Sequence, residues 1–596
     1  MTGAFFKEAD SIQKKADSIQ ISQGSEPLPD NDNFRLQVRR GRRTGKRGTD
    51  RPMAQHTDSR SSLVKNASIL MMATIVSRVI GLLYRRPLGQ VLGSVGLGYY
   101  GLASNLYTIL LLISSYSIPM AVSKNVSERV ALRQYKNAEK IFRAAMLYAV
   151  IVGGVTALIT WFGGRYLLPP NQPNAVPALR MLAPTIFFSA ILGVFRGYFQ
   201  AYRTMTPTSI SQILEQIVNA IVSVLGAWLL IRTFAPGGGQ DAAVYGSVGG
   251  TMGTGAGVLT GLLFMLLVYG INRKWFVSRR SLDRGTEEES YGDILKKLML
   301  MITPIIFTSF IYNCSAYLDS YLYSSILGFR GVAADQLSAA YGEYSNYYMP
   351  MIGIPLALAS ASTSAMMPEV AGRHATGDIR GVNREVIRTL QLTMFICIPA
   401  MVGLTVLAFP IMGVLFPSST DLAARLMLTG SVFIITDSFS IITGGVLQSI
   451  GRARTALLNA GASLAVNLVS LAAMLYFFPD LDIYAVMLSN ILFSAVCCVM
   501  NIFSLRKYLG FRHEIRRTYS APLLASAVMG ILAVAVYYGL FYVTRRPFIC
   551  LVCAIFLAML LYMLLYVRLS GITEEEMLHF PMGGRLVRIL RMMKAF

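Results

Sequence analysis

The chain has 596 residues, of which 54% are hydrophobic and only 14% are charged, with a mean hydropathy of +0.52. A soluble protein carries about 25% charged residues, so this composition excludes an ordinary soluble domain and indicates a membrane protein. The net charge of +23 lies mostly in tails and loops, which indicates membrane topology and contact with anionic lipid rather than with nucleic acid.

Residues 1–62 are polar and rich in Gln, Ser, Asp and Arg, with a basic cluster from Arg39 to Arg51. Because few apolar residues are available to form a core, this segment is expected to be a disordered basic cytoplasmic tail. It has no apolar stretch followed by a small-residue cleavage site, so a signal peptide is not expected. No nucleic-acid partner is expected either, since a solvated tail is the simpler interpretation of the basic cluster.

From residue 64 onward, apolar stretches long enough to cross a bilayer recur along the chain. They predict an all-α polytopic membrane protein with about fourteen transmembrane helices. Several stretches contain proline, which membrane helices tolerate where neighbouring helices or cavities satisfy the freed backbone groups. The expected spans are 64–90, 97–121, 138–161, 175–197, 207–231, 244–270, 294–326, 337–368, 384–408, 421–449, 454–478, 482–505, 519–543 and 547–569.

Lysine and arginine are concentrated in the loops after the second, sixth, eighth and twelfth spans, whereas the loops on the opposite side hold few. The positive-inside rule therefore predicts a multi-pass protein of the cell membrane with both termini in the cytoplasm. The short segment from 571 to 596 is expected on the same side.

The first span carries arginines inside an apolar helix. Arg78 lies near its middle, and Arg85 follows almost two helical turns later, so both should point the same way about 10 Å apart along the axis. Arginine at mid-membrane costs about 2.5–3.5 kcal/mol even on lenient scales, so Arg78 is expected to face a water-filled cavity or an anion. Alternatively, Arg78 pairs with a buried carboxylate such as Asp319 and only holds helices together. Arg85 and Arg86 lie nearer the helix end, where arginine can also extend to the lipid headgroups.

Asn105 and Lys124 are further polar candidates for a site in the first lobe. Lys124 lies at the cytoplasmic end of the second span. It is either a substrate-binding residue or an anchor of the membrane topology. Arg196 and Glu215 flank the fourth and fifth spans and could pair with each other.

Acidic residues within the later spans are candidates for an ion or coupling site. They are Asp319, Glu343 and Asp437, in the seventh, eighth and tenth spans. Charged groups inside a membrane are costly, so they usually mark a functional site or pair with another group. Asp319 could be a counter-ion for Arg78, a proton or sodium site, or a polar contact between helices.

The sequence lacks the common catalytic motifs of enzymes. It has no Ser/His/Asp arrangement, paired catalytic carboxylates or phosphate-binding glycine loop, so no enzyme activity, ATP hydrolysis or cofactor is expected. The four histidines are scattered, so no metal site is expected. The six cysteines lie in apolar segments and are expected to be buried hydrophobic residues rather than disulfides. The glycines from Gly249 to Gly257 are expected to allow close helix packing.

Two similar segments indicate an internal repeat. GYFQAYRTMTPT begins at Gly197 after the fourth span, and GVLQSIGRARTA begins at Gly445 after the tenth. An even number of spans separates them, so the halves should share one orientation, related by a pseudo-two-fold axis along the membrane normal. We therefore expect two six-helix lobes followed by two C-terminal helices. The expected boundaries are 1–62 for the basic tail, 63–271 for the N-lobe, 272–293 for a cytoplasmic linker, 294–505 for the C-lobe, 506–570 for the last two spans and 571–596 for a cytoplasmic tail.

Segments in the first two spans resemble a known transporter family. Ser77–Gly81 reads SRVIG, Tyr84–Gly89 reads YRRPLG, and Ser114–Lys124 reads SSYSIPMAVSK. These segments resemble the MOP (multidrug/oligosaccharidyl-lipid/polysaccharide) exporter superfamily, most closely its MurJ and SpoVB/YtgP branch from Gram-positive bacteria. The resemblance extends from about residue 62 to residue 570 and implies fourteen spans in two lobes.

The resemblance implies flipping of undecaprenyl-pyrophosphate-linked peptidoglycan precursor (lipid II) from the inner to the outer leaflet by alternating access, for cell-wall biosynthesis. It implies that Arg78 is the first of two essential arginines in the first span. Tyr84 stands where the second is usual, so either Arg85 or Arg86 would take that role. Lys124 would be the basic residue at the end of the second span, and the family's arginine in the eighth span has no clear match.

A cavity lined by Arg78, Arg85, Arg86 and Lys124 would suit the pyrophosphate of a lipid-linked oligosaccharide. Membrane potential, or Na⁺ or H⁺ bound near Asp319, would drive the transport. Three alternatives remain: a flippase for a capsule, teichoic or exopolysaccharide unit; a cation-coupled multidrug exporter, which the basic first lobe disfavours; and a non-transporting scaffold that recruits cell-wall enzymes through its basic tails.

Overall fold

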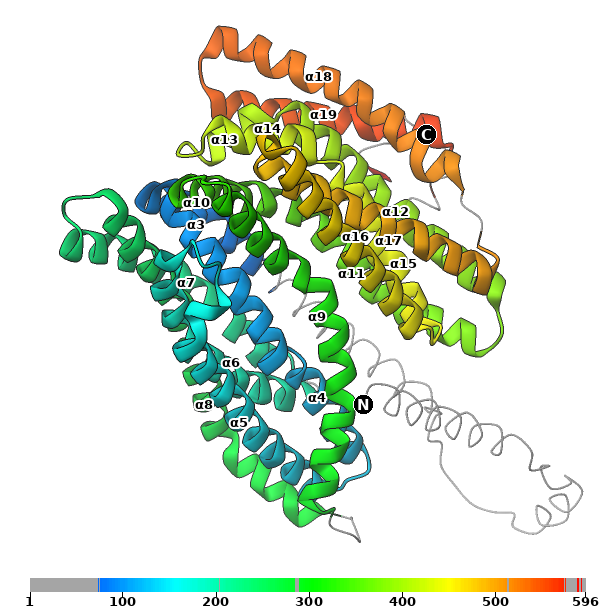
Figure 1. The fold of residues 1–596 in the computed structure, drawn as a ribbon. Coiled ribbons are helices and arrows are strands. Elements are labelled where there is room, and N and C mark those ends of the chain that lie inside the picture. The colour runs from blue at the N-terminus through cyan, green and yellow to red at the C-terminus, as the bar shows by residue number, and fades with distance from the viewer. Residues whose placement is uncertain are drawn as a thin grey trace, which may run out of the picture. The chain divides into compact units, whose positions relative to one another are not determined.

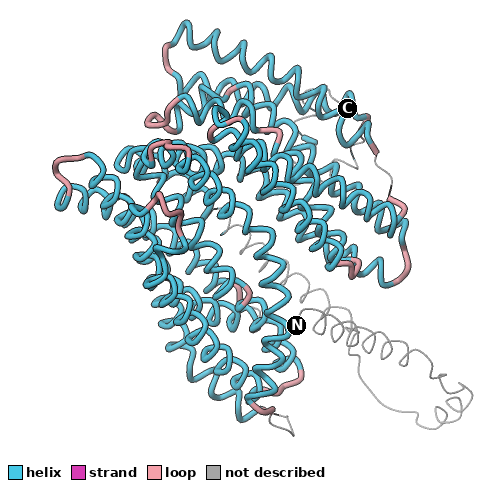
Figure 2. Tube along the Cα trace, viewed as in Figure 1, coloured by secondary structure: helices cyan, strands magenta, loops and turns pink. Residues whose placement is uncertain are grey.

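The computed structural model describes residues 73, 76–202, 204–283, 289–511, 514–572, 574, 587, 588 and 591. Within these residues the chain is helical, with short connections and no strand (Figure 2). This confirms the all-α fold class. The predicted basic tail, 1–62, lies outside the described residues.

The N-half, which we define as residues 76–283, holds the helices before the central charged segment. Residues 76–83 are helical, and hydrogen bonds from Tyr84 N to Ile80 O and from Leu88 N to Tyr84 O continue that helix into α3. Gly93 has φ +66° inside α3, so the chain bends there between the first two predicted spans. The helices are α3 (Arg85–Leu111), α4 (Ile118–Ala131), α5 (Tyr135–Leu167), α6 (Val176–Ala201), α7 (Thr206–Phe234) and α8 (Gly239–Arg279), with the π-helix η1 (Leu112–Tyr116) and the 3-10 helices η2 (Pro173–Ala175) and η3 (Arg280–Leu282) between them.

The C-half, residues 289–572, follows (Figure 1). Its helices are α9 (Tyr291–Phe329), α10 (Ala334–Glu343), α11 (Met349–Ala375), α12 (Ile379–Val406), α13 (Ala408–Leu415), α14 (Asp421–Gly430), α15 (Phe433–Ser449), α16 (Ala453–Phe477), α17 (Ile483–Leu509), α18 (Ala521–Thr544) and α19 (Pro547–Ser570). Three short elements complete it: the π-helices η4 (Tyr344–Tyr348) and η6 (Arg516–Ser520), and the 3-10 helix η5 (Pro479–Leu481).

Among the described residues, 11 helices are long and apolar enough to cross a membrane, or 12 if the bent pair α14 and α15 is one span. The described residues therefore do not reach the predicted number of fourteen transmembrane helices, and that number stays a prediction. The first predicted span begins outside the described residues and continues into α3. The seventh forms α9 but is not one of the counted helices.

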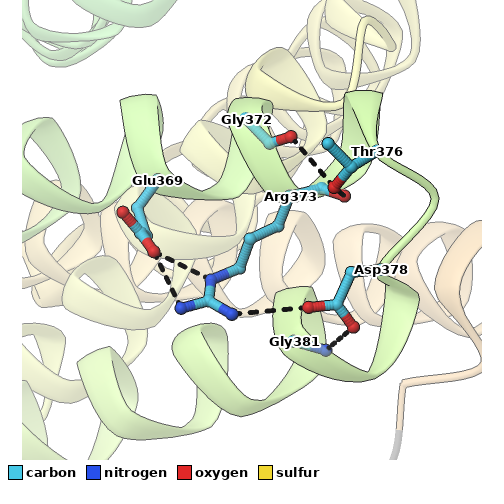
Figure 3. Close-up of polar contacts among 6 residues, drawn as sticks. All are labelled: Glu369, Gly372, Arg373, Thr376, Asp378 and Gly381. Atoms are coloured by element: carbon cyan, nitrogen blue, oxygen red, sulfur yellow. Dashed lines mark hydrogen bonds and ion pairs between the residues drawn. The ribbon is translucent and has the colours of Figure 1, made fainter.

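One connection illustrates how local chemistry ends one helix and begins the next. Between α11 and α12, Arg373 bonds to Glu369 at 2.8 Å and to Asp378 at 3.4 Å (Figure 3). Asp378 caps α12 by accepting a hydrogen bond from the Gly381 N–H at 2.8 Å. The turn uses Gly377 at φ +74°, a conformation that glycine adopts without strain.

Three hydrophobic cores hold the helices together. One lies in the N-half, among α4, α5, α6 and α8, and also takes in Ile294, Leu298 and Ile302 of α9. A second lies in the C-half and includes residues of α11, α12, α15 and α17. The third contains residues of both halves, such as Tyr99 and Tyr347. The halves are thus joined through a shared core, and α9 contributes both to the N-half core and to the shared core, through Tyr323 and Leu327.

Glycines set the closest helix contacts. A Cβ built at Gly253 of α8 would overlap Ser223 of α7, and one at Gly257 would lie 2.5 Å from the Glu215 carbonyl oxygen. The close packing expected for the Gly249–Gly257 segment is therefore confirmed. All six cysteines are free, and all but Cys553 are buried, as expected of small hydrophobic residues.

Candidate functional site: a basic cavity between the halves

A cavity of about 530 Å³ lies between the N-half and the C-half. Its walls come from the first helix, from α6 and α7, and from α11. The lining residues are Ser77, Arg78, Gly81, Leu82, Tyr84, Arg85, Arg196, Gln212, Glu215, Gln216, Asn219, Pro350, Gly353 and Ile354. The volume lies within the range of small-molecule sites.

Two of the predicted arginines lie in this cavity. Arg78 and Arg85 both line it, as their seven-residue spacing on one helix predicts. Arg86 is exposed and is not among the lining residues, since the next position on a helix points about 100° away. Lys124, on α4, is likewise exposed outside the cavity. The structure therefore brings together only two of the four predicted substrate-binding residues.

Arg85 also joins the two halves. Its Nη1 donates to the carbonyl oxygens of Ser345 at 3.3 Å and of Asn346 at 3.1 Å, both in or beside η4. Pro350 follows η4 and has no N–H. It can donate neither to Asn346 O in an α-helical pattern nor to Ser345 O in a π-helical pattern. The guanidinium of Arg85 thus donates to two carbonyls to which Pro350 cannot donate.

A polar stripe on α7 forms another wall of the cavity, beside the first helix: Gln216 Oε1 lies 3.8 Å from a Cβ built at Gly81. Gln212, Gln216 and Asn219 line the cavity at helical spacing. The amide oxygen of Gln212 is buried without a hydrogen-bond partner, and so is the hydroxyl of Ser77 on the first helix. Both atoms are available to a polar ligand.

Between α6 and α7 a charged pair completes the wall. Arg196 Nη2 bonds to Glu215 Oε2 at 2.7 Å, and Arg196 Nε donates to Ser211 Oγ at 3.0 Å. The predicted pairing of Arg196 with Glu215 is therefore confirmed. Because Glu215 balances Arg196, the positive charge of the cavity comes from Arg78 and Arg85.

Asp319 lies elsewhere, buried in the C-half. Its carboxylate accepts hydrogen bonds from Ser315 at 3.1 Å, from Asn467 at 3.1 Å and from Asn490 at 2.8 Å. Among the residues that the structure describes, no arginine contacts it. The alternative in which Asp319 pairs with Arg78 is therefore not observed. Instead, Asp319 forms a polar contact between α9, α16 and α17.

The other two acidic candidates lie apart from the cavity lining. Glu343 is buried at the end of α10, where Oε1 accepts the backbone N–H of Thr420 at 3.0 Å. Its Oε2 has no hydrogen-bond partner. Asp437 is partly buried on α15.

Sequence reasoning missed two groups of polar residues. The α7 stripe, Gln212 to Asn219, could have been found from its helical spacing within the fifth span. Asn467 and Asn490 are single polar residues in the eleventh and twelfth spans, and only the folded chain brings them to Asp319.

Comparison with known proteins places this chain in a family. A family model described as "polysaccharide biosynthesis protein" matches residues 63–371, which is more than half of the chain. Lipid II flippase MurJ of Bacillus subtilis is 25% identical over 79% of this chain and 88% of its own length. Stage V sporulation protein B of the same organism is 23% identical over 89% and 99%.

Among solved structures, one of lipid II flippase MurJ in an inward closed conformation has a TM-score of 0.54 to this chain. It is 14% identical and covers 84% of this chain and 98% of its own. This likeness shows the fold. The chain is a multi-pass membrane protein that belongs to the polysaccharide biosynthesis protein family, within the MOP exporter superfamily.

Proposed function

We propose that this protein flips a lipid-linked glycan pyrophosphate, and specifically lipid II, from the inner to the outer leaflet. The observation that carries the proposal is the placement of Arg78 and Arg85 in one cavity between the halves. The similarity to lipid II flippase MurJ supports the choice of substrate.

The cavity has the chemistry that such a headgroup needs. A pyrophosphate cannot cross hydrocarbon unaided, and guanidinium groups give it strong charge-assisted hydrogen bonds. The uncharged amides of Gln212, Gln216 and Asn219 in the same cavity suit the hydroxyl and amide groups of a sugar. We propose that the arginines hold the phosphates, that the α7 stripe faces the sugar, and that the prenyl chain stays in the lipid.

The halves are fastened together at one end. Hydrogen bonds join Tyr99 to Asp335 at 2.7 Å and Gln172 to Ser338 at 2.7 Å, near the turns that the positive-inside rule places outside. The cavity would then be reached from the cytoplasm in this conformation. Opening these contacts while closing the other end would carry the headgroup across.

We propose that Asp319 couples this motion to a cation, Na⁺ or H⁺. Its carboxylate is buried, and the amide oxygen of neighbouring Asn467 is buried without a hydrogen-bond partner. A cation would satisfy both oxygens. An inside-negative membrane potential would also favour outward movement of the negatively charged headgroup and inward movement of the cation.

A flippase for another polysaccharide repeat unit is the second candidate, because the same prenyl pyrophosphate would meet the same arginines. A multidrug exporter for cations fits less well. Glu215 is the carboxylate of the cavity lining, and it is already paired with Arg196.

The test is flipping by the purified protein in liposomes that contain either lipid II or a capsule-type lipid-linked repeat unit. Arg78→Gln and Arg85→Gln should each lower flipping at least tenfold, because each removes a charged hydrogen bond worth about 1.5–3 kcal/mol. The control is Arg86→Gln, which changes the same charge outside the cavity and should keep near-normal activity. Wild-type flipping rates in the Arg78 and Arg85 variants would overturn the assignment of this cavity as the binding site. Flipping of the repeat unit but not of lipid II would show that the repeat unit is the substrate.

A further inference from the structure

A second cavity lies in the N-half and shares no lining residue with the one described above. Its volume is about 610 Å³, and it is enclosed by the start of α5, the end of α6 and the end of α8. By the positive-inside rule these helix ends face the cytoplasm. The wall of the cavity is made mainly of aromatic and basic side chains, and Glu139, Gly270 and Val277 complete it.

Aromatic rings form a packed cluster on one side of this cavity. Phe142 and Tyr198 have ring centroids 4.4 Å apart, and Tyr269 stacks on Phe276 at 5.6 Å. Tyr198 also contacts Phe276 at 5.1 Å. All four rings line the cavity. They form a rigid surface on which a planar or apolar part of a ligand can lie.

Three arginines, Arg143, Arg273 and Arg280, line the same cavity with one acidic residue, Glu139. Glu139 bonds to Arg143 at 2.8 Å and also to Arg280. Arg273 is exposed, and within the described residues it has no hydrogen-bond or ion-pair partner. One carboxylate therefore balances three guanidinium groups, which leaves the cavity with an excess of two positive charges.

This cavity borders the connection between the halves. Arg280 begins the segment that leads from α8 to α9, and Asp283 of that segment accepts the backbone N–H of Lys136 at 2.7 Å. Glu289, just before α9, donates its backbone N–H to Asn137 Oδ1 at 3.1 Å, and its carboxylate pairs with Lys297 at 2.8 Å. A ligand that contacts Arg280 would touch the point where this connection leaves the N-half.

We propose that this second cavity binds an organic phosphate, with the phosphate on Arg273 and its neighbouring arginines and the rest of the ligand against the aromatic cluster. Guanidinium groups bind phosphate oxygens in pairs, and basic pockets between helices on the cytoplasmic side suit phospholipid headgroups. The phosphate can belong to an anionic lipid or to a soluble phosphate ester. The volume accommodates either headgroup.

Full-length protein in nanodiscs of zwitterionic phosphatidylcholine provides the test. In one arm, adenosine monophosphate is titrated and binding is measured by calorimetry. In the other, phosphatidylglycerol is mixed into the nanodisc and its retention is measured by native mass spectrometry. Binding in the first arm alone identifies a soluble ester, and retention in the second alone identifies a lipid. Either result supports the proposal that the cavity binds an organic phosphate.

Arg273→Gln should weaken the binding about tenfold. Lys274→Gln is the matched control, because Lys274 is exposed beside Arg273 but does not line the cavity. Arg78→Gln should also bind normally, which keeps this proposal separate from the flippase proposal. Binding of neither probe would overturn the inference, and so would equal losses in Arg273→Gln and Lys274→Gln.

Discussion

Arg85 and Pro350 act on the same two carbonyl groups from opposite halves of the protein. The proline withholds a backbone donor from Ser345 and Asn346, and the arginine supplies one at 3.3 and 3.1 Å. Arg85 therefore has two roles: it lines the cavity, and its hydrogen bonds hold the two halves together. A phosphate that binds Arg85 would compete with this fastening.

This relationship predicts coupling between the two residues. Pro350→Ala restores an N–H that can satisfy one of the carbonyls, so Arg85→Gln should then cost less. We expect a coupling free energy of roughly 0.5–3 kcal/mol in a double-mutant cycle. It is measured as the fall in unfolding temperature caused by Arg85→Gln with and without Pro350→Ala. Equal falls in both backgrounds would show that the residues act independently.

The pair of Arg196 and Glu215 predicts an asymmetric response. Arg196→Gln leaves the Glu215 carboxylate unpaired in a cavity that is proposed to hold phosphate, so substrate binding should weaken about tenfold, or about 1.4 kcal/mol. Arg196→Gln combined with Glu215→Gln should recover most of this loss. Binding of a prenyl pyrophosphate to purified protein measures both effects. A double variant as weak as Arg196→Gln would mean that Arg196 itself contacts the ligand.

Gly98 predicts a further effect, because it lies in close backbone contact at the end where hydrogen bonds hold the two halves together. A Cβ built at Gly98 of α3 would overlap the carbonyl of Ser338 in α10, which packs beside α3 (Figure 1). Gly98→Ala should therefore push these helices apart and disfavour this conformation.

The opening can be followed with a short bifunctional thiol reagent that links cysteines placed at Gln240 and Asp335, whose Nε2 and Oδ1 atoms lie 3.2 Å apart. The cross-link should form several-fold more slowly with Gly98→Ala. Gly461→Ala, where nothing lies within 4 Å of the added Cβ, should leave the rate unchanged. Unchanged cross-linking in Gly98→Ala would contradict the proposed closure.

The surroundings of Asp319 predict an effect on energy coupling rather than on substrate binding. Asp319→Asn removes the buried charge that is proposed to hold a cation, so stimulation of flipping by a Na⁺ or pH gradient should be lost. Binding of prenyl pyrophosphate should remain, since Asp319 does not line the cavity. Flipping in liposomes with imposed gradients measures this. Asp437→Asn is the control, and full gradient stimulation in Asp319→Asn would rule out the coupling role.

Asp482, in the connection between α16 and α17, predicts a pH dependence of stability. Burial raises the pKa of its carboxyl, although hydrogen bonds from Tyr323 and the backbone oppose the rise. A carboxyl with a raised pKa in the folded state favours folding when protonated. Its contribution is complete below the ordinary value of 3.8 and is lost as the pH rises through the raised pKa.

The unfolding temperature of the wild type should therefore fall relative to that of Asp482→Asn as the pH rises from about 4, where model carboxyls titrate. The amide of the variant can still accept the Tyr323 hydroxyl but cannot ionise. Thermal unfolding across this pH range measures the difference. If the unfolding temperatures of the two proteins change in parallel with pH, Asp482 is not the cause of the pH dependence.

The sequence by itself determined the features that depend on local periodicity. The apolar spans, the common direction of Arg78 and Arg85, and the glycine face of α8 all follow from residue spacing along one helix. The pairing of Arg196 with Glu215 was also predictable, because a short connection places the ends of α6 and α7 together.

Only the tertiary structure decided which residues meet across the chain. Arg85 rather than Arg86 lines the cavity, and Asp319 bonds to Asn467 and Asn490 rather than to Arg78. The physical reason is that such contacts depend on how each helix is rotated and shifted against helices far away in the sequence. Packing of the whole set of helices fixes those rotations, and the residue pattern of a single span does not.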